Sequence, residues 1–329
     1  MSMIFPCPFF GRCGGCLYQD LPHEVYLEKK RQFIRRSFSD KGINLTLDDF
    51  IEVPLETRRR AGFKFSNGKI GFNEHKGHRL IDIDTCLLLT SGLNALLPAF
   101  RELIRQIGGS GELFVLETPM GVDVHILLPH KKADLSLWEK ISLWAGQVPS
   151  VVRVLLNHTP VLEKAPLPVP SAESFLQPSV YGEETLIRHV LQASKGYKTA
   201  IDLFCGAGTF LKPLLNAGLK AIGYDIAGDS LKTLGKNAVA RDLFRNPLSV
   251  EELNDIDFVV MDPPRAGAQL QTNELANATV QKIIMISCNP ITAARDTAIL
   301  LKNGKKLISA VGLDQFNYSN HVELILTFS

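Results

Sequence analysis

Hydrophobic positions follow two different patterns along the chain, and the change between them predicts separate domains. Between about residues 51 and 162, apolar residues come in short runs bounded by turn residues, which predicts mostly β structure. From about residue 200 they form continuous runs separated by helix-length segments, which indicates a parallel sheet covered by helices on both faces. The proline-rich stretch at residues 160–178, with Pro166, Pro168 and Pro170, is typical of a linker.

The first part of the chain combines predicted helices with predicted hairpins. An imperfect apolar stripe predicts a helix over residues 22–38, and further helices are expected at residues 93–107 and 135–145. Asn67-Gly68 and Pro119-Met120-Gly121 are turn sequences of the kind that connect antiparallel strands. Strands are expected at residues 61–65, 70–72, 80–83, 113–116 and 122–128.

The last part of the chain is predicted to form an α/β domain. Its buried strands are expected at residues 200–204, 221–224, 258–261 and 283–286. The chain then divides into residues 1–50, 51–165 and 166–329. These are a cysteine-rich segment with a basic helix, a β-rich central domain and the α/β domain.

Length and charge narrow the class of protein. A chain of 329 residues suits two domains with a small appendage. No apolar run approaches the roughly 20 residues of a membrane helix, and a signal-peptide pattern is missing, so we expect a cytoplasmic protein. The net charge of +2 says little about partners, but two basic clusters favour a phosphate-binding face over merely solvated faces. The clusters are Lys29, Lys30, Arg31, Arg35 and Arg36, and Arg58, Arg59, Arg60 and Lys64.

Three sequence features indicate a nucleoside cofactor at the carboxyl edge of the predicted sheet. The strand at residues 200–204 runs into a glycine loop at Gly206, where backbone can approach a ligand closely. The next strand ends in Asp225, whose carboxylate can bind the two hydroxyls of a ribose. The strand after that ends in Asp262-Pro263-Pro264-Arg265, a stiff loop in which an arginine stands where amino-methyltransferases carry an aromatic residue. An amino-methyltransferase is therefore the weaker interpretation.

Cys288 is the candidate nucleophile. It ends the predicted strand at residues 283–286 in the sequence Ser287-Cys288-Asn289-Pro290, at the same sheet edge as the cofactor features. A lone cysteine is more often a small core residue, but a thiol beside a cofactor can attack a substrate.

These motifs together resemble the RNA uracil-C5-methyltransferases, which comprise a tRNA T-loop enzyme and two bacterial 23S rRNA enzymes. The resemblance also includes Gln177 and His321-Val322-Glu323, and it covers nearly the whole chain. It implies a Rossmann-like domain that binds S-adenosylmethionine (SAM), with a mainly parallel sheet and an antiparallel C-terminal strand. It further implies that Cys288 is the nucleophile, that Glu323 is the general base, and that SAM contacts Gln177, Phe204, Gly206, Asp225 and Asp262.

The chemistry of this family explains the residue types. A thiolate that adds to C6 of uracil makes C5 nucleophilic, C5 accepts the methyl group, and a base then removes the C5 proton so that the thiolate can leave. The target base must leave its stack, so a flipped uracil is expected. The chain departs from the usual Asp-x-Phe-Pro-x-Thr sequence before His321, because it has Phe316-Asn317-Tyr318-Ser319.

The remaining cysteines predict a metal site. Cys7, Cys13 and Cys16 have the spacing C-x5-C-x2-C, and Cys86 follows about seventy residues later. The pattern alone leaves an iron–sulfur cluster, zinc and no metal open. The resemblance to the 23S rRNA enzymes, which share this spacing, implies a 4Fe-4S cluster, whereas Cys205 is expected to pack within the glycine loop.

The expected partner is 23S rRNA, with no membrane and no obligate protein partner. The tRNA enzyme lacks the four cysteines, and the chain begins only six residues before Cys7, which leaves no room for an added RNA-binding β-barrel (TRAM) domain. The chain therefore resembles the shorter 23S rRNA enzyme, which acts on uracil 747. The alternatives are another 23S uracil, the tRNA T-loop uracil, or a non-catalytic RNA-binding iron–sulfur protein.

Overall fold

A computed structural model describes residues 7–129, 134–164, 172, 176–226 and 229–329. The chain folds into two compact units that do not follow its order. The first unit consists of residues 1–21, 54–180 and 317–319, and the second of residues 22–53, 181–316 and 320–329. Within the described residues, no helix is long and apolar enough to cross a membrane.

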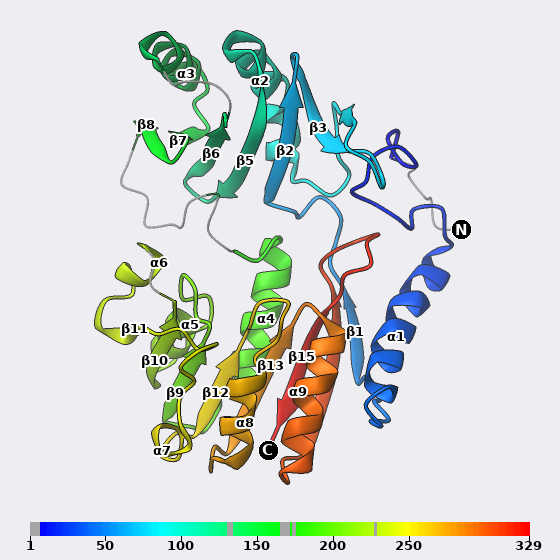
Figure 1. The fold of residues 1–329 in the computed structure, drawn as a ribbon, viewed down its shortest axis with the longest axis vertical. Coiled ribbons are helices and arrows are strands. Elements are labelled where there is room, and N and C mark those ends of the chain that lie inside the picture. Colours follow the sequence, from blue (N-terminus) through cyan, green and yellow to red (C-terminus); the bar gives the residue numbers. More distant parts are fainter. Residues whose placement is uncertain (1–6, 130–133, 165–171, 173–175, 227–228) are drawn as a thin grey trace. The chain divides into compact units, whose positions relative to one another are not determined.

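The second unit is built on a sheet of eight strands among the described residues, in the order β1-β14-β15-β13-β12-β9-β10-β11 (Figure 1). All neighbouring strands pair in parallel except β15, which is antiparallel to both β13 and β14. The expected α/β fold with a mainly parallel sheet and an antiparallel C-terminal strand is therefore confirmed. The strands are β1 (Asp49–Glu52), β9 (Thr199–Leu203), β10 (Lys220–Asp225), β11 (Ala238–Ala240), β12 (Phe258–Met261), β13 (Lys282–Ser287), β14 (Leu307–Asp314) and β15 (Glu323–Phe328).

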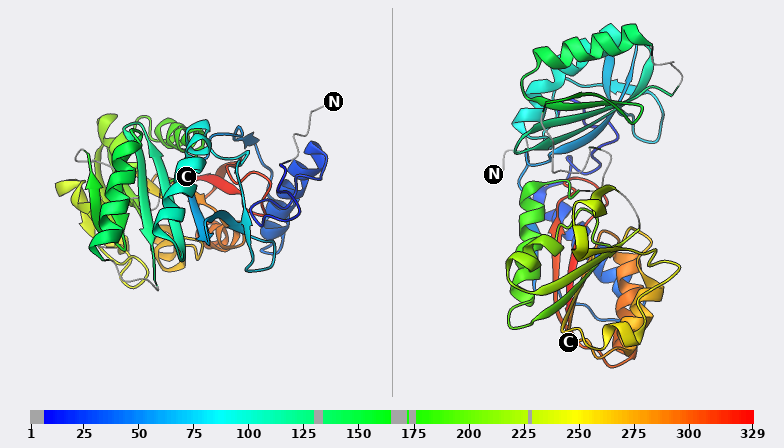
Figure 2. Two further views of the ribbon diagram at one scale, coloured as in Figure 1. Left: turned by 90° about the horizontal axis from the view of Figure 1, so that it is seen from above. Right: turned by 90° about the vertical axis from the view of Figure 1, so that its left-hand side faces the viewer.

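Helices cover both faces of this sheet, and each face has its own apolar core. Side chains of α1, α8 and α9 form one core with strand residues such as Val259 and Met285. Side chains of α4 and α5 form the other core with residues such as Val260 and Ile284. Figure 2 shows α4 and the pair α8 and α9 on opposite sides of the sheet. The helices are α1 (His23–Ser39), α4 (Val180–Ala193), α5 (Leu211–Asn216), α6 (Asp229–Lys232), α7 (Val250–Leu253), α8 (Gln269–Asn277) and α9 (Pro290–Lys302), with a 3₁₀ turn at Gly235–Asn237.

The first unit has a sheet of seven strands within its described part, in the order β4-β3-β2-β5-β6-β7-β8. Helices α2 and α3 supply Phe100 and Trp144 to one apolar core with this sheet. The turn at Asn67-Gly68 has positive φ at both residues, as a tight hairpin requires. The elements are β2 (Arg60–Ser66), β3 (Lys69–Asn73), β4 (Leu80–Asp82), α2 (Ser91–Ile107), β5 (Ser110–Thr118), β6 (Gly121–Leu127), α3 (Leu135–Gln147), β7 (Val151–Leu156) and β8 (Thr159–Glu163).

The units divide the chain differently from the boundaries expected at residues 50 and 165. Residues 22–53 group with the eight-stranded sheet because β1 pairs in parallel with β14 and because α1 buries Ile34 and Phe38 in the core shared with α9. The start of the expected linker forms β8, which pairs with β7. Pro166, Pro168 and Pro170 lie outside the described residues.

Candidate active site

The loop after β9 has the strained backbone of a ligand-binding turn. Phe204, a bulky residue, has a φ of 64°, in the left-handed region that such residues rarely adopt. The amides of Phe204 and Cys205 both donate to the carbonyl of Tyr224, at 2.8 and 3.1 Å, which holds the turn. Gly206 also has a positive φ, and a Cβ built on it would meet no atom within 4 Å. The loop therefore presents open backbone at the carboxyl edge of the sheet.

Asp225 closes this loop from the neighbouring strand. Its Oδ2 accepts the amide of Gly206 at 2.7 Å, and its Oδ1 accepts the amide of Ile226 at 2.6 Å. The two predicted cofactor residues Gly206 and Asp225 therefore lie together. Cys205 is buried under this turn against Gly223, where a built Cβ would come within 2.7 Å of the sulfur, so packing is its role in this structure.

Asp202 is an acid that the sequence reasoning did not single out. It is fully buried in β9, and none of the described residues makes a hydrogen bond to either carboxyl oxygen. Burial raises its pKa well above the usual range, the nearby amide of Leu211 opposes this shift, and the charges of Asp262 and Asp225 add to it. The sequence feature that could have identified Asp202 is an acidic residue inside an otherwise apolar strand that runs into a glycine loop.

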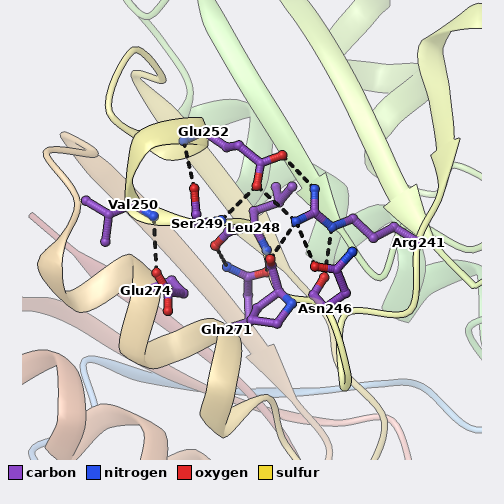
Figure 3. A network of polar contacts seen from close by, with 9 residues as sticks. Arg241, Asn246, Leu248, Ser249, Val250, Glu252, Gln271 and Glu274 are labelled. Atoms are coloured by element: carbon purple, nitrogen blue, oxygen red, sulfur yellow. Dashed lines mark hydrogen bonds and ion pairs between the residues drawn. The ribbon is translucent and has the colours of Figure 1, made fainter.

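A polar network around Arg241 shapes the loop that follows β11 (Figure 3). The amide of Arg241 donates to the carbonyl of Asp225 at 2.7 Å. The Arg241 guanidinium binds both carboxylate oxygens of Glu252, at 2.6 and 2.9 Å, and the carbonyl of Asn246 at 2.8 Å. The closed loop presents Phe244, which is 44% exposed, with its ring 5.4 Å from that of Phe204. Phe244 is thus a second aromatic residue beside the glycine loop. Unlike Phe204, it was not predicted from the sequence.

Cys288 lies at the end of β13, where the chain turns into α9. Burial raises the pKa of its thiol to about 11, the charges of Glu323 and Asp262 contribute, and the Arg265 guanidinium opposes them. Asn289 caps α9 by accepting the amide of Ile291, and its Nδ2 donates to the carbonyl of Arg265 at 2.9 Å. The structure therefore brings Cys288, Asp262 and Arg265 together.

Glu323 begins β15 and is only 2% exposed. Its Oε2 accepts a hydrogen bond from Gln315 Nε2 at 2.8 Å. Burial and the charge of Asp262 raise the pKa of its carboxyl well above the usual range, and the hydrogen bond from Gln315 opposes this shift. A carboxyl group in such surroundings suits general acid–base chemistry near neutral pH.

The predicted residues do not all belong to the same unit. Gln177 lies in the first unit, buried, with its carbonyl accepting a hydrogen bond from Arg59 Nε at 3.1 Å. The interpretation of Arg58–Arg60 as a phosphate-binding face is wrong for Arg59, because this side chain is buried. Arg60 donates to the carbonyl of Leu176 at 2.9 Å, so its guanidinium is also engaged within the protein.

The four predicted metal-binding cysteines come together in the first unit. The amide of Gly14 donates to the carbonyl of Asn73 at 2.9 Å, which attaches the N-terminal segment to β3. Burial raises the pKa values of the Cys13, Cys16 and Cys86 thiols, and each is raised further by charges of other cysteines in the set. Among the described residues, no three histidine, cysteine or acidic side chains lie close enough to hold a single metal ion.

A basic residue belongs to this cysteine group. Burial lowers the pKa of the Arg58 guanidinium, and the charges of Cys86 and Cys16 oppose this shift, so the cation lies near both thiols. The amide of Arg58 donates to the carbonyl of Leu88 at 2.9 Å, beside the turn that carries Cys86.

Comparison with known sequences gives relatives along nearly the full chain. A sequence model of the tRNA (uracil-5-)-methyltransferase family matches residues 241–328. An uncharacterized RNA methyltransferase of Agrobacterium fabrum is 34% identical over 345 residues, which cover 96% of this chain and 82% of the relative. A protein of Brucella suis with the same description is also 34% identical, over 97% of this chain and 82% of its own length.

A solved structure gives the same fold. The tRNA (uracil-54, C5)-methyltransferase of Pyrococcus abyssi, crystallised with S-adenosyl-L-homocysteine, superposes with a TM-score of 0.74. The match covers 96% of this chain and 86% of that enzyme at 21% identity, so it bears on the fold alone.

The environment of Cys288 predicts how fast its thiol reacts. Because its pKa is about 11, alkylation by iodoacetamide should accelerate steadily as the pH rises from 7 to 10. Arg265→Met removes the cation that lowers this pKa, so alkylation of the Cys288 peptide at pH 9 should slow by roughly twofold to fivefold, the modest effect of an exposed and solvent-screened charge. Mass spectrometry of the peptide measures the rate.

The matched control is Arg245→Met, which removes an exposed arginine of the same unit that forms an ion pair with Asp242. Equal rates for Arg265→Met, Arg245→Met and the unchanged protein would contradict the electrostatic influence of Arg265 on the thiol.

Proposed function

The chain belongs to the RNA (uracil-5-)-methyltransferases, and from this membership and its site we propose that it methylates C5 of a uracil in 23S rRNA, in the cytoplasm, through a covalent adduct on Cys288. The observation that carries the proposal is the meeting of a thiol and a buried carboxyl group at one sheet edge, where the charge of Glu323 influences the pKa of Cys288.

The residues around the glycine loop fit SAM. The open space above Gly206 leaves room for close approach of a ligand, and the two oxygens of Asp225 suit a ribose diol. SAM carries a sulfonium and an ammonium group, and the acidic residues Asp202 and Asp262 lie close enough at this edge for the charge of Asp262 to raise the pKa of Asp202. Phe204 is proposed as an apolar contact, and Gln177 is carried over from the family resemblance alone.

In the proposed reaction, Cys288 is the nucleophile and Glu323 is the general base. Cys288 releases its thiol proton to solvent, the resulting thiolate adds to C6 of the flipped uracil, and the π electron pair of the C5–C6 double bond moves toward C5. C5 takes the methyl group from the sulfonium of SAM. The Glu323 carboxylate then removes the C5 proton, the C5–C6 double bond forms again, and Cys288 leaves as a thiolate.

We propose that Cys7, Cys13, Cys16 and Cys86 hold a 4Fe-4S cluster with a structural role. None of the four thiols forms a disulfide, all four are partly buried, and the charges of Cys86, Cys13 and Cys7 raise the pKa of Cys16. Three clustered cysteines with one distant cysteine suit a cubane iron–sulfur cluster better than zinc, which usually takes two close pairs of ligands. Arg58 would offset part of the negative charge of the cluster.

The covalent step can be trapped with RNA that contains 5-fluorouracil. Fluorine at C5 cannot leave as a proton does, so incubation with SAM should give a protein–RNA adduct that survives denaturing electrophoresis and maps to Cys288. Cys288→Ala should form no adduct and lose turnover by at least about a thousandfold. An adduct on Cys288→Ala, or retained activity, would exclude the mechanism and favour an amino-methyltransferase.

The RNA target can be identified by mapping methylated nucleosides in a strain that lacks the gene. We expect 5-methyluridine to disappear from position 747 of 23S rRNA and to return when the unchanged gene is restored, but not with Cys288→Ala. Loss from another 23S position or from the tRNA T-loop would keep the chemistry and replace the substrate.

The cluster can be tested by its iron and sulfide content after anaerobic reconstitution. The unchanged chain should bind about four iron atoms and show the visible absorbance of a cluster, and Cys86→Ser should lose most of both. Cys288→Ser, which removes a thiol outside the group, should keep its iron. Binding of one zinc ion instead, or equal iron in Cys86→Ser, would rule out the proposed cluster.

A further inference from the structure

The loop between β14 and β15 is held at both ends by one lysine of α1. Lys30 is 2% exposed, and its ammonium group forms an ion pair with Asp314 at the end of β14. The same Nζ donates to the carbonyls of Phe316 at 3.0 Å and His321 at 2.8 Å. Three acceptors match the three N–H donors of an ammonium group, so Lys30 fixes the main chain on both sides of the loop.

A tyrosine completes this contact. Tyr26 lies one helical turn before Lys30 and donates its hydroxyl to the other carboxylate oxygen of Asp314, which is 1% exposed. Because the pair is buried, water cannot readily replace either partner, and the loop cannot shift without leaving a buried charge uncompensated. We call Tyr26, Lys30 and Asp314 the α1 clamp.

The α1 clamp holds the main chain next to Gln315, the residue that donates a hydrogen bond to Glu323. Gln315 lies between Asp314 and Phe316, both of which the clamp holds, and its Nε2 donates to Glu323 Oε2 at 2.8 Å. Gln315 is 3% exposed, and a Cβ built on Gly182 of α4 would come within 2.6 Å of its Oε1. The side-chain amide of Gln315 therefore packs against α4, and the clamp holds the two residues on either side of Gln315 in the chain.

We propose that the α1 clamp, acting through Gln315, positions the Glu323 carboxyl group for removal of the C5 proton. Lys30 and Gln315 are then positioning residues, and α1 belongs to the catalytic apparatus although it lies almost 300 residues from Glu323 in sequence. Gln315 binds Oε2 and so directs Oε1 as the oxygen that takes the proton. The inference rests on the proposed role of Glu323 as the base.

The step that depends on this arrangement is the last one. Glu323 takes the proton from C5, the C–H electron pair restores the C5–C6 double bond, and the sulfur of Cys288 departs with the electrons of the C6–S bond. If the carboxyl group is misplaced, addition and methyl transfer still occur, and methylated RNA stays bound to Cys288. Misplacement therefore leaves a signature that simple unfolding does not.

The experiment uses full-length protein, SAM and ordinary uracil-containing RNA, and it measures covalently held RNA and released 5-methyluridine separately. Gln315→Met removes the hydrogen bond that Gln315 Nε2 donates to Glu323, and Lys30→Met with Asp314→Asn removes both charges of the clamp together. In each we expect product release to slow by about tenfold, methylated adduct to accumulate, and the KM values for SAM and RNA to change by less than about twofold.

The matched control is Lys305→Met. Lys305 also donates to two carbonyls of the second unit, Ala278 at 2.9 Å and Val280 at 2.7 Å, away from Glu323. It should lower thermal stability without accumulating adduct. If the clamp and Gln315 variants behave like Lys305→Met, with adduct and product falling in proportion or unchanged, the contacts are structural only and the inference is overturned.

Glu323→Gln distinguishes this failure from failure of the proposed function. It should accumulate the methylated adduct more strongly than any positioning variant. If Glu323→Gln releases product at the normal rate, Glu323 is not the base, and the positioning role falls with it. If Glu323→Gln accumulates adduct and the clamp variants do not, only the positioning role falls.

Discussion

The site depends on one physical constraint. Acidic groups are buried at one edge of the parallel sheet, and burial makes their charged forms unfavourable. Burial raises the pKa values of Asp202, Glu323 and Cys288, and the charge of Asp262 adds to each shift. Arg265 is the cation that opposes the shift at Cys288. Such a site favours a cationic ligand, because a nearby sulfonium or ammonium group would lower the raised pKa values of these acids and stabilise their charged forms. These buried acids are thus suited to a cationic methyl donor.

The protein positions the two halves of this site by different means. On the cofactor side, main-chain geometry dominates: Phe204 accepts a left-handed backbone, and amides of this turn and of Ile226 are satisfied by Tyr224 and Asp225. On the side of the base, buried side chains dominate, because a loop of eight residues separates β14 from β15. Breaking a buried ion pair such as Lys30–Asp314 by removing one partner costs about 3–5 kcal/mol, which is enough to keep the ends of that loop fixed.

The residues at the carboxyl edge of the sheet could mostly be predicted from the sequence. The positions of β1 and α1 against that sheet could not. Continuous apolar runs predict parallel strands, and parallel strands align their carboxyl ends, so Gly206, Asp225, Asp262 and Cys288 could be grouped without coordinates. The pairing of β1 with β14 could not be predicted, because about 260 residues separate the partners and a strand of four residues carries little signal. Lys30 was taken as part of a basic cluster, although its position four residues from both Tyr26 and Ile34 places it on the buried side of α1.

The same contacts explain how this chain can differ from its family in the loop before Glu323. The family resemblance leads us to expect a proline and a threonine there, and the chain has Asn317 and Ser319. Lys30 binds main-chain carbonyls of Phe316 and His321, and the carbonyl of Tyr318 accepts the amide of Leu17 at 2.6 Å. Main-chain contacts do not depend on which side chains the loop carries. Without the rigid φ of proline, the loop relies on these contacts, and Tyr318 adopts a φ of 57° that a free loop would not favour. Substitution within the loop is therefore compatible with a fixed Glu323 as long as its two ends stay bound to α1.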